Sequence, residues 1–135
     1  MALQLSAAVR NAMLDAIETT IGTSAVLKIR TGAAPASVAT ADSGTVLATL
    51  TLPSDWLAAA SSGSKAKSGT WEDASADAAG TAAHYRIYAS DGTTAHLQGT
   101  VTATGGGGDL TVDNVVFAAG QSFTVTSYSW TAANS

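Results

Sequence analysis

The chain has 135 residues, of which six are basic and ten acidic, so its net charge is −4 at neutral pH. This length predicts one domain with one core, and the shortage of basic residues argues against binding to nucleic acid or to an anionic membrane surface. The chain contains no cysteine, which excludes disulfides, thiolate metal sites and a cysteine nucleophile. No apolar run is as long as a membrane span. Charged residues make up only 12% of the chain, a composition that suits contact with other protein.

Residues 6–21 are predicted to form a helix. Aliphatic side chains recur along it every four residues: Val9, Met13, Ile17 and Ile21. Ala12 and Ala16 widen this stripe, and charged side chains occupy the rest of the cylinder. Ser6 is a suitable N-cap and Gly22 a suitable residue beyond the C-terminus. We expect the stripe to pack on the protein's own sheet, with a neighbouring subunit as the alternative.

The rest of the chain shows the pattern of short strands. Alternating or β-rich segments occur at 25–31, 45–52, 70–71, 109–112, 114–117 and 122–131, and a hairpin is expected within 82–104. Glycine and proline separate these segments, and no second helix is evident. We predict a mainly β protein, a β-sandwich or jelly-roll with one N-terminal α-helix. The single domain would span 1–135, with the sandwich over about residues 24–132.

The hairpin is predicted in most detail. A turn at Asp91-Gly92 is expected, with Gly92 in the left-handed conformation that ends a three-residue loop over 90–92. A two-residue loop would oppose apolar and polar side chains, and the longer loop avoids this. The predicted cross-strand pairs are Ile87 with Ala95, Tyr85 with Leu97, and Arg86 with His96.

Metal and catalytic sites find little support in the sequence. His84 and His96 share one predicted face of the hairpin, but the predicted register sets them diagonally and supplies no carboxylate to complete a site. Surface or interface imidazoles are the preferred interpretation. There is no nucleophile elbow, and a Ser/His/Asp triad has no positioned members. We therefore expect no enzyme activity and no cofactor.

An acidic tract could in principle ligate calcium. Its carboxylates are Glu72, Asp73 and Asp77, to which Asp109 and Asp113 could add. Nothing matches the spacing of a calcium loop, so a solvated acidic loop is the preferred interpretation. The four glycines 105–108 lack the strand, turn and helix order of a phosphate cradle, which favours a flexible connection.

Aromatic side chains on a β scaffold can fill a core, anchor a protein interface or stack on a sugar ring. Core or subunit contact is favoured here, because the last strand supplies only serine and threonine as polar partners for a sugar. Together with the helix stripe and the polar face of the hairpin, these side chains are the candidate protein-interface residues: Val9, Met13, Trp56, Trp71, His84, Arg86, Tyr88, His96, Tyr128 and Trp130.

Several segments carry a resemblance that covers almost the whole chain. They are a strand that ends in the turn at 32–35, the strand GTVLA at 44–48, an acidic Ala-Asp-Ala segment before YRIY at 85–88, the turn DGT at 91–93, and a closing strand rich in serine and threonine. In these segments the chain resembles small structural proteins of tailed bacteriophages and prophages.

The resemblance implies a capsid decoration, or cement, protein. Such a protein would be made in the host cytoplasm, bind the major capsid protein on the exterior of the virion, and self-associate as a dimer or trimer. A tail or baseplate component is the alternative in the same setting. A carbohydrate-binding adhesin module is the competing class, motivated by the tryptophans on a β scaffold.

Overall fold

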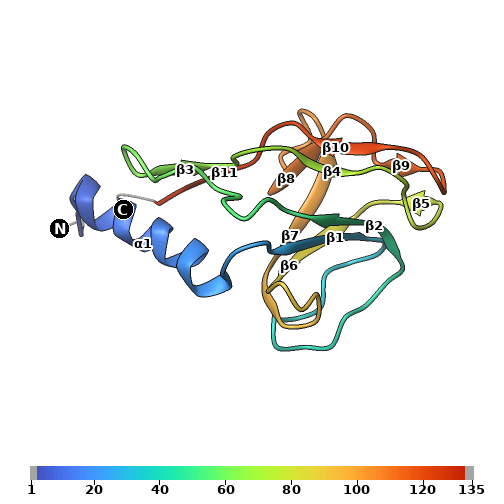
Figure 1. Cartoon of the computed structure of the whole chain (residues 1–135), viewed down its shortest axis with the longest axis horizontal. Coiled ribbons are helices and arrows are strands. Elements are labelled where there is room, and N and C mark those ends of the chain that lie inside the picture. The colour runs from blue at the N-terminus through green and yellow to red at the C-terminus, as the bar shows by residue number, and fades with distance from the viewer. Residues whose placement is uncertain (1–2, 133–135) are drawn as a thin grey trace.

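The computed structural model describes residues 3–132, which form one helix and eleven short strands (Figure 1). The elements are α1 (Ala7–Ile21), β1 (Val26–Arg30), β2 (Val46–Thr51), β3 (Ser64–Ala66), β4 (Trp71–Asp73), β5 (Gly80–Thr81), β6 (His84–Tyr88), β7 (Ala95–Ala103), β8 (Leu110–Val112), β9 (Val116–Phe117), β10 (Phe123–Val125) and β11 (Ser129–Thr131).

Helix α1 begins and ends at the predicted capping residues. The Ser6 hydroxyl accepts a hydrogen bond from the backbone N–H of Val9 at 3.2 Å. At the other end Gly22 has φ +93°, and its N–H donates to the carbonyl of Glu18 at 2.8 Å. Both arrangements satisfy backbone groups that a helix end would otherwise leave unpaired. The chain leaves α1 through this glycine and enters the sheet at β1.

The main sheet has five strands in the order β2-β1-β6-β7-β8, and three further pairs, β10-β4, β11-β3 and β5-β9, complete the described part. The sheet curls, the β3-β11 and β4-β10 pairs lie along one side of it, and α1 projects from the end of the molecule beside β3 (Figure 1). A mainly β protein with one N-terminal helix was predicted, and this is confirmed. The segment expected as one closing strand is two strands, because the chain turns at Tyr128 and buries that side chain.

The predicted hairpin register is wrong by two residues. Ile87 pairs with Leu97, and Tyr85 pairs with Gly99 instead of Leu97. The tyrosine ring lies so close to Gly99 that a Cβ there would be 2.8 Å from it, so a bulky residue cannot occupy that position. The turn does fall at Asp91-Gly92, with Gly92 at φ +71° as expected.

The predicted three-residue loop over 90–92 is too short for this register: the loop spans 90–93, and the side chain of Asp91 fixes it. Its carboxylate accepts hydrogen bonds from the N–H groups of Thr93 and Thr94 and from the hydroxyl of Thr94. The bonds from Thr94, followed by the one from Thr93, lower the pKa of Asp91 to about 2. The N–H of Ala89 then donates to the carbonyl of Thr94 at 2.9 Å and closes the loop. A turn held by an aspartate in this way is stabilised locally.

The four glycines form a short link between two strands that pair with each other. Strands β7 and β8 run parallel although only residues 104–109 join them. Gly105 and Gly107 have φ values of +88° and +79°, which side chains rarely adopt. At Gly108 a Cβ would lie 2.8 Å from the hydroxyl of Thr102. The glycines therefore allow a sharp return that a chain with side chains could not make.

Candidate interaction surface

Helix α1 is held to the rest of the chain by its polar face. The backbone N–H of Gly63, in the loop before β3, donates to the side-chain oxygen of Asn11 at 2.8 Å. Arg10 lies so close to Gly63 that a Cβ there would be 2.3 Å from the guanidinium. One turn further along, the N–H of Ala60 donates to the carboxylate of Asp15 at 3.1 Å. The helix thus provides acceptors for backbone groups of the loop on which it lies.

A buried lysine of β3 is the centre of this contact. The ammonium of Lys65 donates to Asp15 at 2.6 Å, to Glu18 at 2.8 Å and to the carbonyl of Ala58 at 2.9 Å, and its side chain is 1% exposed. Burial alone would lower the pKa of Lys65, but its hydrogen bonds to the two carboxylates outweigh burial and raise it. The hydrogen bond from Lys65, together with the one from the N–H of Ala60, lowers the pKa of Asp15. The lysine is therefore charged, and it ties the helix to the strand.

The aliphatic stripe of α1 packs on the core at its C-terminal end only, so the prediction that it docks on the protein's own sheet holds for part of the stripe. Val9 and Met13 are 46% and 51% exposed, while Ile21 is buried and Ile17 partly buried. Leu14, which lies outside the stripe, is buried. The reason is geometric: a helix has 3.6 residues per turn, so each step of four residues advances about 40° beyond a full turn. Between Val9 and Ile21 the stripe therefore rotates about 120°, from solvent to the core.

The exposed part of the stripe forms a continuous apolar surface. We call it the α1 apolar face and define it as Val9, Ala12, Met13, Ala16 and Ile17. Since the polar side chains Arg10, Asn11, Asp15 and Glu18 contact the loop or β3, this face carries no charge. An uncharged aliphatic surface on an otherwise docked helix is typical of a site that contacts another macromolecule.

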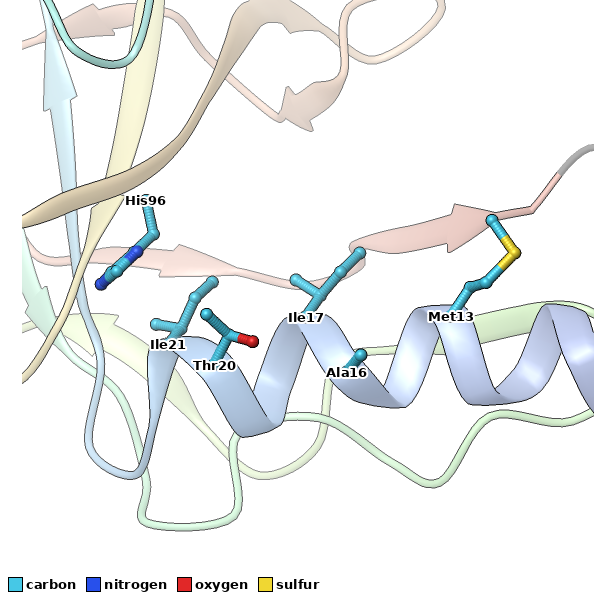
Figure 2. Close-up of a pocket in the computed structure, with 6 residues that line it drawn as sticks. All are labelled: Met13, Ala16, Ile17, Thr20, Ile21 and His96. Atoms are coloured by element: carbon cyan, nitrogen blue, oxygen red, sulfur yellow. The ribbon is translucent and has the colours of Figure 1, made fainter.

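A groove of about 280 Å³ runs along the C-terminal half of this face. Met13, Ala16, Ile17, Thr20 and Ile21 line it from the helix, and His96 closes it from β7 (Figure 2). His96 owes its position to a β-bulge: Ile87 pairs with Leu97 and Tyr88 with Ala95, which leaves His96 unpaired between them. Bulges of this kind redirect a side chain. Of the candidate interface residues, Val9, Met13 and His96 are exposed at this surface.

Three of the candidate aromatic residues belong to the core and not to an interface. Trp56 and Trp71 are fully buried and Tyr128 is 5% exposed, so within this chain they present no surface to a partner. Their rings contact one another, with centroids 5.9 Å apart for the two tryptophans and 5.5 Å apart for Trp71 and Tyr128. The indole N–H of Trp56 donates to the carbonyl of Gly22 at 2.9 Å and so holds the end of α1. Trp130, at the edge of this cluster, remains partly exposed.

The polar face of the hairpin is covered by the chain's own loop. His84, Arg86 and Tyr88 were expected to face water or a partner, but all three are buried beneath residues 31–45. Nδ1 of His84 lies 2.7 Å from the carbonyl oxygen of Gly32. The prediction that this face of the hairpin contacts water or a partner is therefore wrong, because a loop of the same chain covers it.

One carboxylate organises that covering loop. Asp42 accepts hydrogen bonds at 2.8 Å from Arg30, from Arg86 and from the hydroxyl of Tyr88. Burial acts to raise the pKa of Asp42, but the hydrogen bond from Tyr88, the charge of Arg30, and the bond and charge of Arg86 outweigh it, so the pKa is lowered. Arg86 also donates to the carbonyls of Ser37 and Thr40. The arginine, 2% exposed, therefore acts as a clamp for the loop.

The histidines and the acidic tract, which were considered from the sequence as metal ligands, make other contacts. His84 pairs with Thr100 across the hairpin and is buried, whereas His96 lies at the bulge, so the two imidazoles do not form a pair. Asp73 accepts from the N–H of Thr49 at 2.9 Å, and Asp77 from its hydroxyl at 2.7 Å. In residues 3–132, no group of three or more histidines and carboxylates is arranged to hold a metal ion.

The same described residues contain no helix with the length and hydropathy needed to cross a membrane. Comparison of the chain with family models, with curated protein sequences and with solved structures gives no match.

Proposed function

We propose that this chain is a structural, non-enzymatic protein of tailed bacteriophage particles, a capsid decoration protein that binds the major capsid protein lattice and stabilises the head. The observation that supports the proposal most is the exposed α1 apolar face, with Met13 51% exposed on a helix whose polar face is already used. The resemblance of the sequence to small virion proteins provides the setting.

The size of the surface fits attachment to a lattice. A helix of 15 residues is about 22 Å long, so one face of it buries less than the roughly 800 Å² per partner of a standard interface. A single contact would be weak. On a shell that presents many equivalent sites, self-association as a dimer or trimer would link such contacts and raise the overall affinity by effective concentration.

The five-stranded sheet and the three strand pairs would, in this proposal, be the two layers of a β-sandwich or jelly-roll that lies on the capsid exterior. The protein would be made in the host cytoplasm and would need neither nucleic acid nor a membrane for its role. A tail or baseplate component remains the second candidate, since the same apolar face could dock on a tail protein.

The proposal is tested on particles of the phage or prophage that encodes the chain. Quantitative mass spectrometry of purified particles and a density map of the head should find the chain in many copies on the outer surface, with α1 against the shell. Sedimentation equilibrium of the purified chain should give a dimer or trimer. Particles that lack the chain would refute the proposal, and density confined to the tail would favour the second candidate.

A further inference from the structure

A second hollow, separate from the α1 groove, is lined by aromatic and polar side chains. It has a volume of about 470 Å³ and opens between β7, the β7–β8 link and β11. Tyr85 and Leu97 line it from the sheet, Asp109 from the link, and Trp130 from β11. This volume lies within the range of small-molecule sites.

The aromatic wall of the hollow is supported by ring contacts and hydrogen bonds. Trp130 is only partly buried, and its ring meets Tyr128 at 5.3 Å and Trp56 at 6.3 Å between centroids, edge-on in both cases. Its indole N–H donates to the hydroxyl of Tyr128 at 2.8 Å. That hydroxyl lies 2.5 Å from the hydroxyl of Tyr85, and burial raises the pKa of Tyr128 to about 12, so it stays protonated. The exposed part of the indole is therefore held in place before any ligand arrives.

The rim of the hollow carries free hydrogen-bonding groups. Oδ2 of Asp109 accepts from the N–H and the hydroxyl of Thr100 at 2.9 and 3.0 Å, and among residues 3–132 nothing donates to Oδ1. Ser129 and Thr131 are exposed, and their hydroxyls bond to no group in the described part of the chain. Strand β11 pairs with β3 on one edge, and in residues 3–132 no strand pairs with its other edge.

We propose that this hollow binds a saccharide of one or two pyranose rings. Trp130 would provide the stacking surface for a sugar ring, while Oδ1 of Asp109 and the hydroxyls of Ser129 and Thr131 would bond the sugar hydroxyls. The sequence pattern disfavours a sugar ligand, because the last strand offers only serine and threonine as polar partners for it. The fold adds a carboxylate, that of Asp109, from a link distant in the sequence. A carboxylate acceptor forms stronger hydrogen bonds than a neutral group, and it has a fixed position here.

Other ligand classes fit the hollow less well. Asp109 would repel a phosphate, which disfavours nucleotides and nucleic acid. An apolar ligand would leave the rim groups unpaired, which is costly once they are buried. An extended peptide could add to the open edge of β11, but this strand has three residues and offers too few backbone bonds for a stable addition. The proposal is independent of the capsid role, since it uses neither α1 nor its groove.

The test starts with a glycan array probed with the intact chain, followed by titration of soluble glucose, galactose, N-acetylglucosamine and rhamnose into labelled chain observed by NMR. We expect the indole N–H of Trp130 and the backbone of Asp109 and Ser129 to shift. Asp109→Asn should weaken binding about tenfold, the effect of losing one charge-assisted hydrogen bond. Ser129→Arg, which fills the hollow from an exposed position, should abolish it.

Thr124→Arg is the matched control, because it places the same side chain on an exposed position of β10 outside this hollow. It should bind sugar as the natural chain does. The proposal is overturned if the folded chain binds no sugar on the array or in the titrations, or if Ser129→Arg binds as well as the control. The proposal is also overturned if an extended peptide shifts these NMR signals and none of the sugars does.

Discussion

Replacement of Lys65 is the most informative test of how α1 is held. The ammonium is 1% exposed, whereas its partners Asp15 and Glu18 are 49% and 23% exposed. In Lys65→Met the two carboxylates can turn to water and a methionine fills the space, so the free energy of unfolding should fall by only about 1 kcal/mol. In the double variant Asp15→Asn/Glu18→Gln the lysine stays buried with the carbonyl of Ala58, and an uncompensated buried charge costs about 3 to 5 kcal/mol.

Urea unfolding of the two variants, with hydrogen exchange of the α1 amides, measures this asymmetry. Lys67→Met is the matched control: its ammonium donates to the carbonyl of Gly69 and lies over the ring of Trp71, and its loss should change stability by less than about 1 kcal/mol. The double variant should lose the protection of α1 first. If Lys65→Met destabilises the chain as much as the double variant does, the interpretation of Lys65 as the buried partner is wrong.

Three further predictions concern the helix and the hairpin. Leu14→Ala should cost about 2 to 4 kcal/mol in chemical unfolding and Met13→Ala less than about 1, because the first is buried and the second half exposed; the reverse order would refute the docking of α1. The pKa of Asp15 in the folded chain lies below its unfolded value of 3.8, so its stabilisation is present above that pH and is lost as the pH falls through the folded value. Acid titrations of unfolding should show a smaller loss in Lys65→Met than in the natural chain, because the bond from Ala60 to Asp15 remains in the variant. Gly99→Ala should lower stability by about 1 to 3 kcal/mol in thermal unfolding, because its Cβ meets the opposite tyrosine ring; an unchanged melting temperature would contradict the hairpin register.

Local patterns predicted the local structure of this chain. The caps at Ser6 and Gly22, the turn at Asp91-Gly92 and the mainly β class all follow from residue types that act over a few positions. Local patterns did not predict which side of α1 packs against the rest of the chain, because the strongest aliphatic stripe is not the buried face. Lys65 ties this face to β3, and one of two lysines in a small polar segment gives no signal that it is the buried one.

Contacts between distant segments explain the other differences. Asp42 and Arg86 are 44 residues apart, and nothing near Asp42 indicates that its loop covers the hairpin. The register likewise depends on a glycine opposite Tyr85, which an alternation pattern does not rank above Leu97. A useful sequence signal was present in both cases: an arginine among β-formers needs a carboxylate partner, and a glycine within a strand often faces a bulky neighbour.

The most direct test of the central claim is binding to capsids. Empty, expanded capsids assembled from the major capsid protein of the same genome are mixed with the natural chain, with Met13→Glu and with Ala8→Glu, and bound protein is measured by co-sedimentation. Ala8 is exposed on the same helix but lies outside the α1 apolar face. We expect saturable binding of the natural chain and of Ala8→Glu, and loss of binding for Met13→Glu. Equal binding of all three, or binding of none, would contradict the central claim.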